Sequence, residues 1–254
     1  MSAAETKRGT VPPDHYPGLK ASARIFHDLQ TNRKGILSRI RQADIDPAYY
    51  EPTAEAIRIA EREAKKNLIA CYRLVVEPQI IEWQQSTRNI GEHTLALLLG
   101  EIGHPVIART FMSVGTGESR TLVFTGMKTR RVSDLWSYCG HGAPSKRRRG
   151  MTVEEALACG SPAAKTAVWK LATAQVKEVK RFGENPYRHV YDEMRDRYDD
   201  THPEWTNGHQ QAAAIRVVGK EILRDLWRVA QGLEPWFGHR QWHDATHRGT
   251  AVSV

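Results

Sequence analysis

The sequence lacks the features that mark secreted and membrane-spanning proteins. It has three cysteines, Cys71, Cys139 and Cys159, which lie far apart without a Cys-x-x-Cys pair. This spacing argues against a disulfide framework or a thiolate zinc site. The longest purely apolar run, Leu95 to Leu99, is far below the roughly 20 residues that span a bilayer. The N-terminal segment has no apolar core of a signal peptide. These absences predict a reduced, cytoplasmic protein without a membrane partner.

Acidic residues are in deficit. The chain of 254 residues has 37 Lys and Arg against 29 Asp and Glu, which gives a net charge of +8. Such a balance favours a polyanionic partner but says nothing about the fold. Seven tryptophans and a hydrophobic share of 40% are too many for a disordered chain. The composition therefore predicts a globular, basic protein.

Apolar residues recur at helical spacing along most of the chain, which predicts a mainly α fold. Between Leu19 and Ile45 the pattern is interrupted at Asn32 and Gly35, and two short helices are expected there. A long helix is expected to begin with Thr53 as its N-cap, and Pro78 is expected to end or kink it. Further helices are expected from residue 132 to a glycine-rich loop and over residues 152–181, 187–198 and 210–231.

One segment has a different composition. Between Ile107 and Lys128, two short runs of β-branched and aromatic residues flank the sequence "GTGES". This pattern is typical of a β-hairpin. The expected fold is mainly α, with a long N-terminal helix and a small inserted β-hairpin.

The stretch "TRNIGEHTLALLLGEIG" contains a break between two helical segments. A helix that begins just after Gly91 points unsatisfied backbone N–H groups outward, and such an end binds phosphate without side chains. Gly91 has no side chain that would block a phosphate from this helix end, and the side chain of Ile90 can fill the core of the hairpin. This is the arrangement of a helix-hairpin-helix motif, which binds the DNA backbone regardless of base sequence. A plain corner between two helices is the alternative. The residues expected to contact DNA here are Asn89, Ile90, Gly91, His93 and Thr94.

A second stretch, "MKTRRVSDLWSYCGHGAPSKRRRG", has seven cations and one carboxylate, Asp134. The cations lie on both sides of a glycine-rich loop. If such a loop neutralises phosphates, the affinity for nucleic acid depends strongly on the salt concentration. The alternative is a solvated charged face. The cations expected to contact DNA are Lys128, Arg130, Arg131, Lys146, Arg147, Arg148 and Arg149.

These two stretches, with "SDLWSYCG" and "NPYRHVYDEMRDRY…WTNGHQQAAAIRVVGKEILRDLW", resemble the C-terminal half of insertion-sequence one-ten family transposases. The similarity covers about Glu61 to Gly232. Where the family usually has Gly-Ile-Gly, this chain has Asn89, Ile90 and Gly91. The resemblance implies a helical DNA-binding domain over residues 87–232. A helical region over 19–86 precedes it, and flexible segments are expected over 1–18 and 233–254.

The resemblance also raises the question of catalysis. Full transposases of this family have a RuvC-like domain whose acidic residues hold divalent metal, and the first 88 residues here show no strand pattern that carries Asp or Glu. In the full enzymes a loop serine is the nucleophile, and the nearest position here is Ser145. Two hypotheses follow. The chain is either a non-catalytic module that binds DNA or structured RNA, or a strand-transfer component that uses Ser145 while a partner supplies the metal site.

Two further features, a set of tail histidines and a long helix, each allow two interpretations. His239, His243 and His247 are spaced four apart, which suits a zinc site, but surface histidines in a tail explain them as well, and we expect no metal or cofactor. The helix from Glu61 to Trp83 either pairs with a second copy to form a homodimer or is buried against its own chain.

Overall fold

The structure is a computed structural model that describes residues 16–42, 46–115, 121–142, 149–177 and 185–236. It confirms a mainly helical fold with a long N-terminal helix and a small two-stranded antiparallel sheet. In chain order the elements are α1 (Tyr16–Gln42), η1 (Pro47–Tyr49), α2 (Glu51–Val75), α3 (Pro78–Ser86), α4 (Glu92–Ile102), β1 (Ile107–Val114), β2 (Thr121–Thr129), α5 (Val132–Tyr138), α6 (Val153–Ala158), α7 (Pro162–Val176), α8 (Pro186–Thr201) and α9 (Asn207–Val229).

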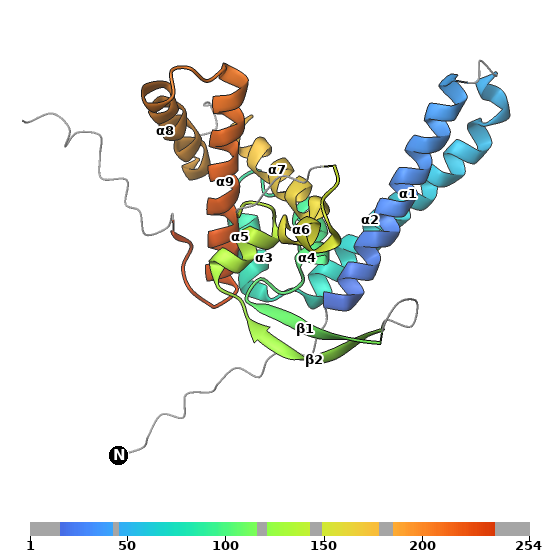
Figure 1. Ribbon diagram of the computed structural model, residues 1–254. Coiled ribbons are helices and arrows are strands. Elements are labelled where there is room, and N and C mark those ends of the chain that lie inside the picture. Colours follow the sequence, from blue (N-terminus) through green and yellow to red (C-terminus); the bar gives the residue numbers. More distant parts are fainter. Residues whose placement is uncertain (1–15, 43–45, 116–120, 143–148, 178–184, 237–254) are drawn as a thin grey trace, which may run out of the picture.

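Two helical arms give the molecule its shape. The helices α1 and α2 form one arm, α8 and α9 form the other, and the two arms diverge from a common base in a V (Figure 1). The strands β1 and β2 lie across the base, away from the free ends of the arms (Figure 1). The space between the arms is therefore separated from the sheet by the body of the protein.

The prediction of two short helices before residue 45 is wrong, because α1 is one continuous helix. Asn32 and Gly35 are both exposed, so neither has to pack, and an interior glycine costs only about 1 kcal/mol. The packing of α1 on α2 and α4 offsets this cost, since Leu19 and Ala23 are completely buried.

The start of α1 also differs from the expectation of a loose arm up to residue 18. Tyr16 is buried, and its hydroxyl donates a hydrogen bond of 2.6 Å to a carboxylate oxygen of Glu77. The other oxygen of Glu77 lies 3.2 Å from Nε2 of His104. This cluster ties the beginning of α1 to the start of α3 and to the segment before β1.

Prolines set the boundaries of the next helices. The helix α2 begins at Glu51 and not after Thr53, because Pro52 fits the first turn, where no N–H is needed. It ends at Val75, and Pro78 begins α3 as a separate helix. Within α2, Ala64 and Leu68 are buried against the rest of the chain. Pairing of this helix with a second copy stays a prediction.

The single helix expected over residues 152–181 is two helices, α6 and α7. The break falls at Gly160, whose φ of +79° suits glycine, and a Cβ there would lie 2.4 Å from the carbonyl oxygen of Ser137. Ser161 then caps α7, since its hydroxyl accepts a hydrogen bond from the amide of Ala164. The close approach to the end of α5 forces a break that helical periodicity cannot reveal.

The predicted β-hairpin is confirmed. The strands β1 and β2 are antiparallel, with Ile107 opposite Thr129, and the register shifts between Thr110 and Phe111. The two last predicted helices are confirmed as α8 and α9, with ends that differ by one to three residues.

The helix α4 lies at the centre of the core. All residues from Leu95 to Gly100 are buried, and a helix that is apolar on every side has to be surrounded by other elements. It packs on α1, α2 and α7. The approach of α1 is especially close, because a Cβ on Gly100 would lie 2.6 Å from the Cβ of Ala23.

Two helical glycines give a test of this packing. We expect Gly100→Ala to lower the free energy of unfolding by about 1–3 kcal/mol, because the added methyl overpacks the α1–α4 contact. The matched variant Gly35→Ala meets nothing within 4 Å and should raise it by about 0.5–1 kcal/mol. Urea unfolding of both variants measures the two values. Equal effects of the same sign would contradict the close α1–α4 contact.

Candidate nucleic-acid interface

The break between α3 and α4 is a tight turn with one side chain buried in the core. Asn89 has a φ of +59°, a left-handed conformation that asparagine tolerates better than most residues. The next residue, Ile90, is only 3% exposed and belongs to the main core. The turn therefore presents Asn89 and Gly91 to solvent while Ile90 fixes it to the protein.

Two glutamine side chains donate hydrogen bonds to carbonyl oxygens of this turn. Nε2 of Gln84 donates to the carbonyl oxygen of Ile90 at 2.8 Å, and Nε2 of Gln175 donates to that of Arg88 at 2.9 Å. Gln175 is completely buried, and its Oε1 accepts from Nδ2 of Asn185 at 2.9 Å. Asn185 in turn caps α8. The turn is thus connected to α3, α7 and α8, and only the structure reveals Gln84 and Gln175 as its supports.

Gly91 is the N-cap of α4, yet nothing inside the protein requires a glycine there. Its φ of −70° is accessible to any residue, it is exposed, and a Cβ would meet no atom within 4 Å. No side chain caps this helix end. The amides of Thr94 and Leu95 donate to the carbonyl oxygen of Gly91 at 3.0 Å. The backbone N–H groups that precede them at the start of α4 are therefore the ones left to donate to a ligand.

The carboxylate of Glu92, which stands in the first turn of α4, is paired within the protein. Nε and the second guanidinium nitrogen of Arg73 donate to its two oxygens at 2.6 Å and 2.8 Å. This bidentate ion pair with α2 neutralises the charge of Glu92. A phosphate at the helix end is therefore repelled less by this carboxylate.

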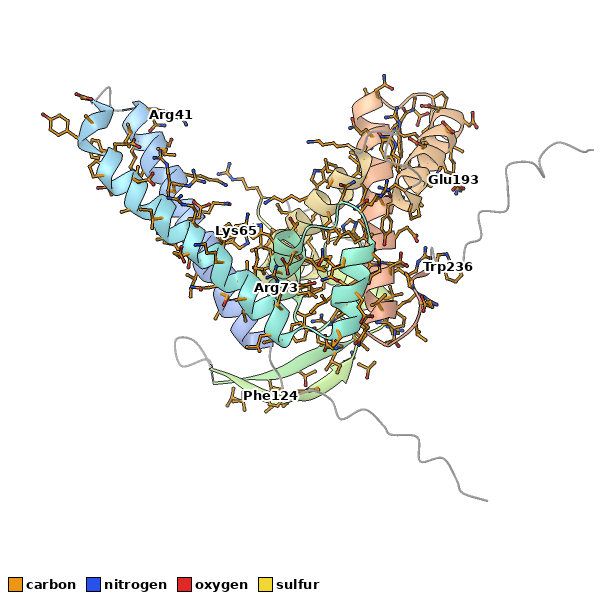
Figure 2. The ribbon with its side chains drawn as sticks, turned by 180° about the vertical axis from the view of Figure 1, so that it is seen from behind. Arg41, Lys65, Arg73, Phe124, Glu193 and Trp236 are labelled. Atoms are coloured by element: carbon orange, nitrogen blue, oxygen red, sulfur yellow. The ribbon has the colours of Figure 1, made fainter. Side chains whose placement is uncertain are left out.

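Positive charges from two other helices converge on the same helix end. His93 is half-buried, and its ring packs edge-on against Phe26 of α1 with 4.8 Å between the ring centres. Its pKa is lowered by burial first and then by the positive charges of Lys65 on α2 and Lys170 on α7. Both lysines are exposed and form no ion pair within the described residues. Lys65 lies nearer the base of its arm than Arg41 (Figure 2). Sequence reasoning missed both lysines.

The cations expected in the second stretch are placed in different ways. Lys128 on β2, Arg131 before α5 and Arg149 before α6 are exposed. Arg131 also lies 3.5 Å from a carboxylate oxygen of Asp134. The positions Ser145, Lys146, Arg147 and Arg148, and the three tail histidines, fall outside the described residues.

Arg130 has a different environment. One guanidinium nitrogen donates to the carbonyl oxygens of Ile102 and His104 at 2.8 Å and 3.3 Å, and the group lies 5.3 Å from the ring centre of Tyr138. Burial lowers its pKa. The side chain therefore closes the C-terminal end of α4, where carbonyl groups lack helical partners.

The start of the basic loop is anchored to α9. A guanidinium nitrogen of Arg216 donates to the carbonyl oxygens of His141 and Gly142, each at 3.1 Å. His141 is 4% exposed, and its ring nitrogens have no hydrogen-bond partner in the described part of the chain. Burial, and then the charges of Arg216, Lys165 and Lys220, lower its pKa from 6.5 to about 4. The buried imidazole is therefore neutral near pH 7.

This imidazole makes stability depend on pH. Between pH 6.5 and pH 4 the unfolded chain takes up a proton that folded His141 refuses, so stability falls as the pH falls through this window. The loss that belongs to His141 is about 3 kcal/mol. Urea unfolding of the wild type and of His141→Leu at pH 7 and pH 4.5 measures it. The variant should lose less stability on acidification, and an equal loss in both proteins would contradict the assignment.

No group of three His, Cys, Asp or Glu residues placed to hold a metal ion occurs among the residues that the structure describes. In the same residues, no helix combines the length and the apolar character needed to cross a bilayer. No protein-family model, curated protein or solved structure matches the chain. The resemblance to insertion-sequence one-ten transposases therefore stays a prediction.

Proposed function

We propose that the chain is a DNA-binding protein that holds the phosphate backbone at the N-terminal end of α4. The observation that carries the proposal is the convergence of three features at one exposed position. Within the described residues, these are a helix end without a side-chain cap, a glycine that no contact requires, and two lysines of α2 and α7 that form no ion pair.

Each feature favours a phosphate for its own reason. The first-turn amides of α4 donate hydrogen bonds, and the helix dipole adds a partial positive charge. Lys65 and Lys170 supply full positive charges. The pKa of His93 is lowered by burial first and then by these two charges, and a bound anion would offset them. The turn is held in place by Ile90, Gln84 and Gln175. Because it is already ordered, little conformational entropy is lost on binding.

The proposed contacts are backbone amides and lysines, so they position a nucleic acid without reading its bases. Duplex DNA, branched DNA and structured RNA all present phosphates, and titrations of the three at several salt concentrations decide which is preferred. The net charge of +8 supports binding to any of them. The proposal does not extend to strand transfer, and Ser145 lies outside the described residues.

The two lysines should account for part of the salt dependence. Each phosphate contact contributes about 0.9 to the slope of log K against log salt on duplex DNA. We expect Lys65→Gln combined with Lys170→Gln to reduce that slope by about 1.8. Fluorescence anisotropy with a labelled duplex measures it.

A control for the lysines lies on the same helix. Lys66 is exposed and forms an ion pair of 2.7 Å with Glu63. Lys66→Gln removes one positive charge, as Lys65→Gln does by itself, but should leave the slope nearly unchanged, whereas Lys65→Gln should reduce it by about 0.9. Equal reductions in both proteins would mean that only net charge matters, and would contradict a phosphate site at α4.

Gly91→Val tests the helix end itself. The valine side chain has open space within the protein, so the melting temperature and the helical circular dichroism should change little. A phosphate that approaches the amides of α4 would collide with the valine, and we expect DNA affinity to fall at least about tenfold, as loss of one charge-assisted contact does. Unchanged affinity in a folded variant would show that the turn is only a corner.

A further inference from the structure

The free end of the α1/α2 arm has two exposed aromatic side chains. The segment η1 joins the two antiparallel helices there, and Tyr49 is 79% exposed while Tyr50 is 38% exposed. The backbone beneath them is ordered by local hydrogen bonds, since the amide of Tyr49 donates to the carbonyl oxygen of Asp46 at 3.2 Å. The two rings are thus presented to solvent from a fixed turn.

Two cations lie at the same end of the arm as these rings. Arg39 and Arg41 occupy the last turn of α1, are exposed, and form no ion pair within the described residues. Figure 2 shows Arg41 at the end of the arm. Asp44 falls outside the described residues. Of the described carboxylates beside the rings, Asp46 accepts a hydrogen bond from the backbone amide of Ala48 at 2.9 Å, and Glu51 pairs with Arg58 at 2.6 Å.

We propose that this tip is a second nucleic-acid contact, in which Tyr49 stacks on an unpaired base while Arg39 and Arg41 neutralise the adjacent phosphates. The inference rests on the proposed function. Aromatic side chains beside cations are the combination that binds single-stranded segments, because every base has a face for stacking. A base inside a continuous duplex offers no such face, so the partner is DNA with a gap or a fork.

The geometry sets the position of the unpaired base. A helix rises about 1.5 Å per residue, which places Tyr50 roughly 22 Å from Lys65 along α2. With about 3.4 Å between neighbouring nucleotides of one strand, this corresponds to roughly six nucleotides from the phosphate at α4. The arm rises from the base of the V on the side away from the sheet (Figure 1). One DNA molecule can therefore reach both contacts.

The test compares a continuous duplex, a gapped duplex and a fork, with 2-aminopurine at successive unpaired positions. We expect the wild type to bind the gapped and forked DNA about fivefold or more tightly than the duplex, and to quench 2-aminopurine at one position through stacking. Tyr49→Ala combined with Tyr50→Ala should abolish the preference and the quenching. The matched double change to Phe should keep both, because it keeps the rings.

Further variants separate the outcomes. Arg39→Gln with Arg41→Gln should lower the salt slope on unpaired DNA by about 0.7 per arginine. Leu74→Ala, which changes a side chain that is 84% exposed near the other end of α2, should change nothing. Equal affinity of the wild type for all three DNAs, or quenching that survives the change to Ala, would overturn this inference alone. Absence of binding to any DNA would overturn the proposed function as well.

Discussion

The burial of α4 is the constraint on which the rest of the structure depends. A helix whose residues from Leu95 to Leu99 are all buried needs neighbours on every side, and α1, α2 and α7 provide them. Gly100 allows α1 to come close enough to fill one of these sides. Because α4 cannot slide or rotate within this packing, the position of its first residue is fixed by the core.

This arrangement has an electrostatic consequence. The packing that encloses α4 also brings Lys65 of α2 and Lys170 of α7 toward its N-terminal end, where the helix dipole is already positive. Like charges held close together oppose the folded state, and the pKa of His93 is lowered by burial first and then by these two charges. Such a group of charges is stabilised when an anion binds, which is a physical reason to expect a ligand there.

The sequence predicted local features well and tertiary ones poorly. The β-hairpin, the turn at Asn89 and the helices α8 and α9 follow from residue patterns within each segment. The break at Gly160 was missed because it results from contact with α5, far away in the sequence. Lys65 and Lys170 were missed for the same reason. The charge of Arg130 predicts a DNA contact, whereas its side chain is enclosed against the carbonyl groups at the end of α4.

The two ends of α4 differ in a way that bears on function. At the C-terminal end, the protein supplies a cation of its own, since Arg130 donates to the carbonyl oxygen of Ile102 and the amide of Gly103 donates to that of Leu99 at 2.8 Å. At the N-terminal end no side chain caps the helix, and the nearest carboxylate, Glu92, is turned to Arg73. A chain that only needed to stabilise α4 could cap this end with Ser, Thr or Asp, which contribute about 1 kcal/mol. This end, which no described side chain caps, is supported by part-buried glutamine hydrogen bonds and has lysines nearby. It is better suited to an anion that comes from outside the protein.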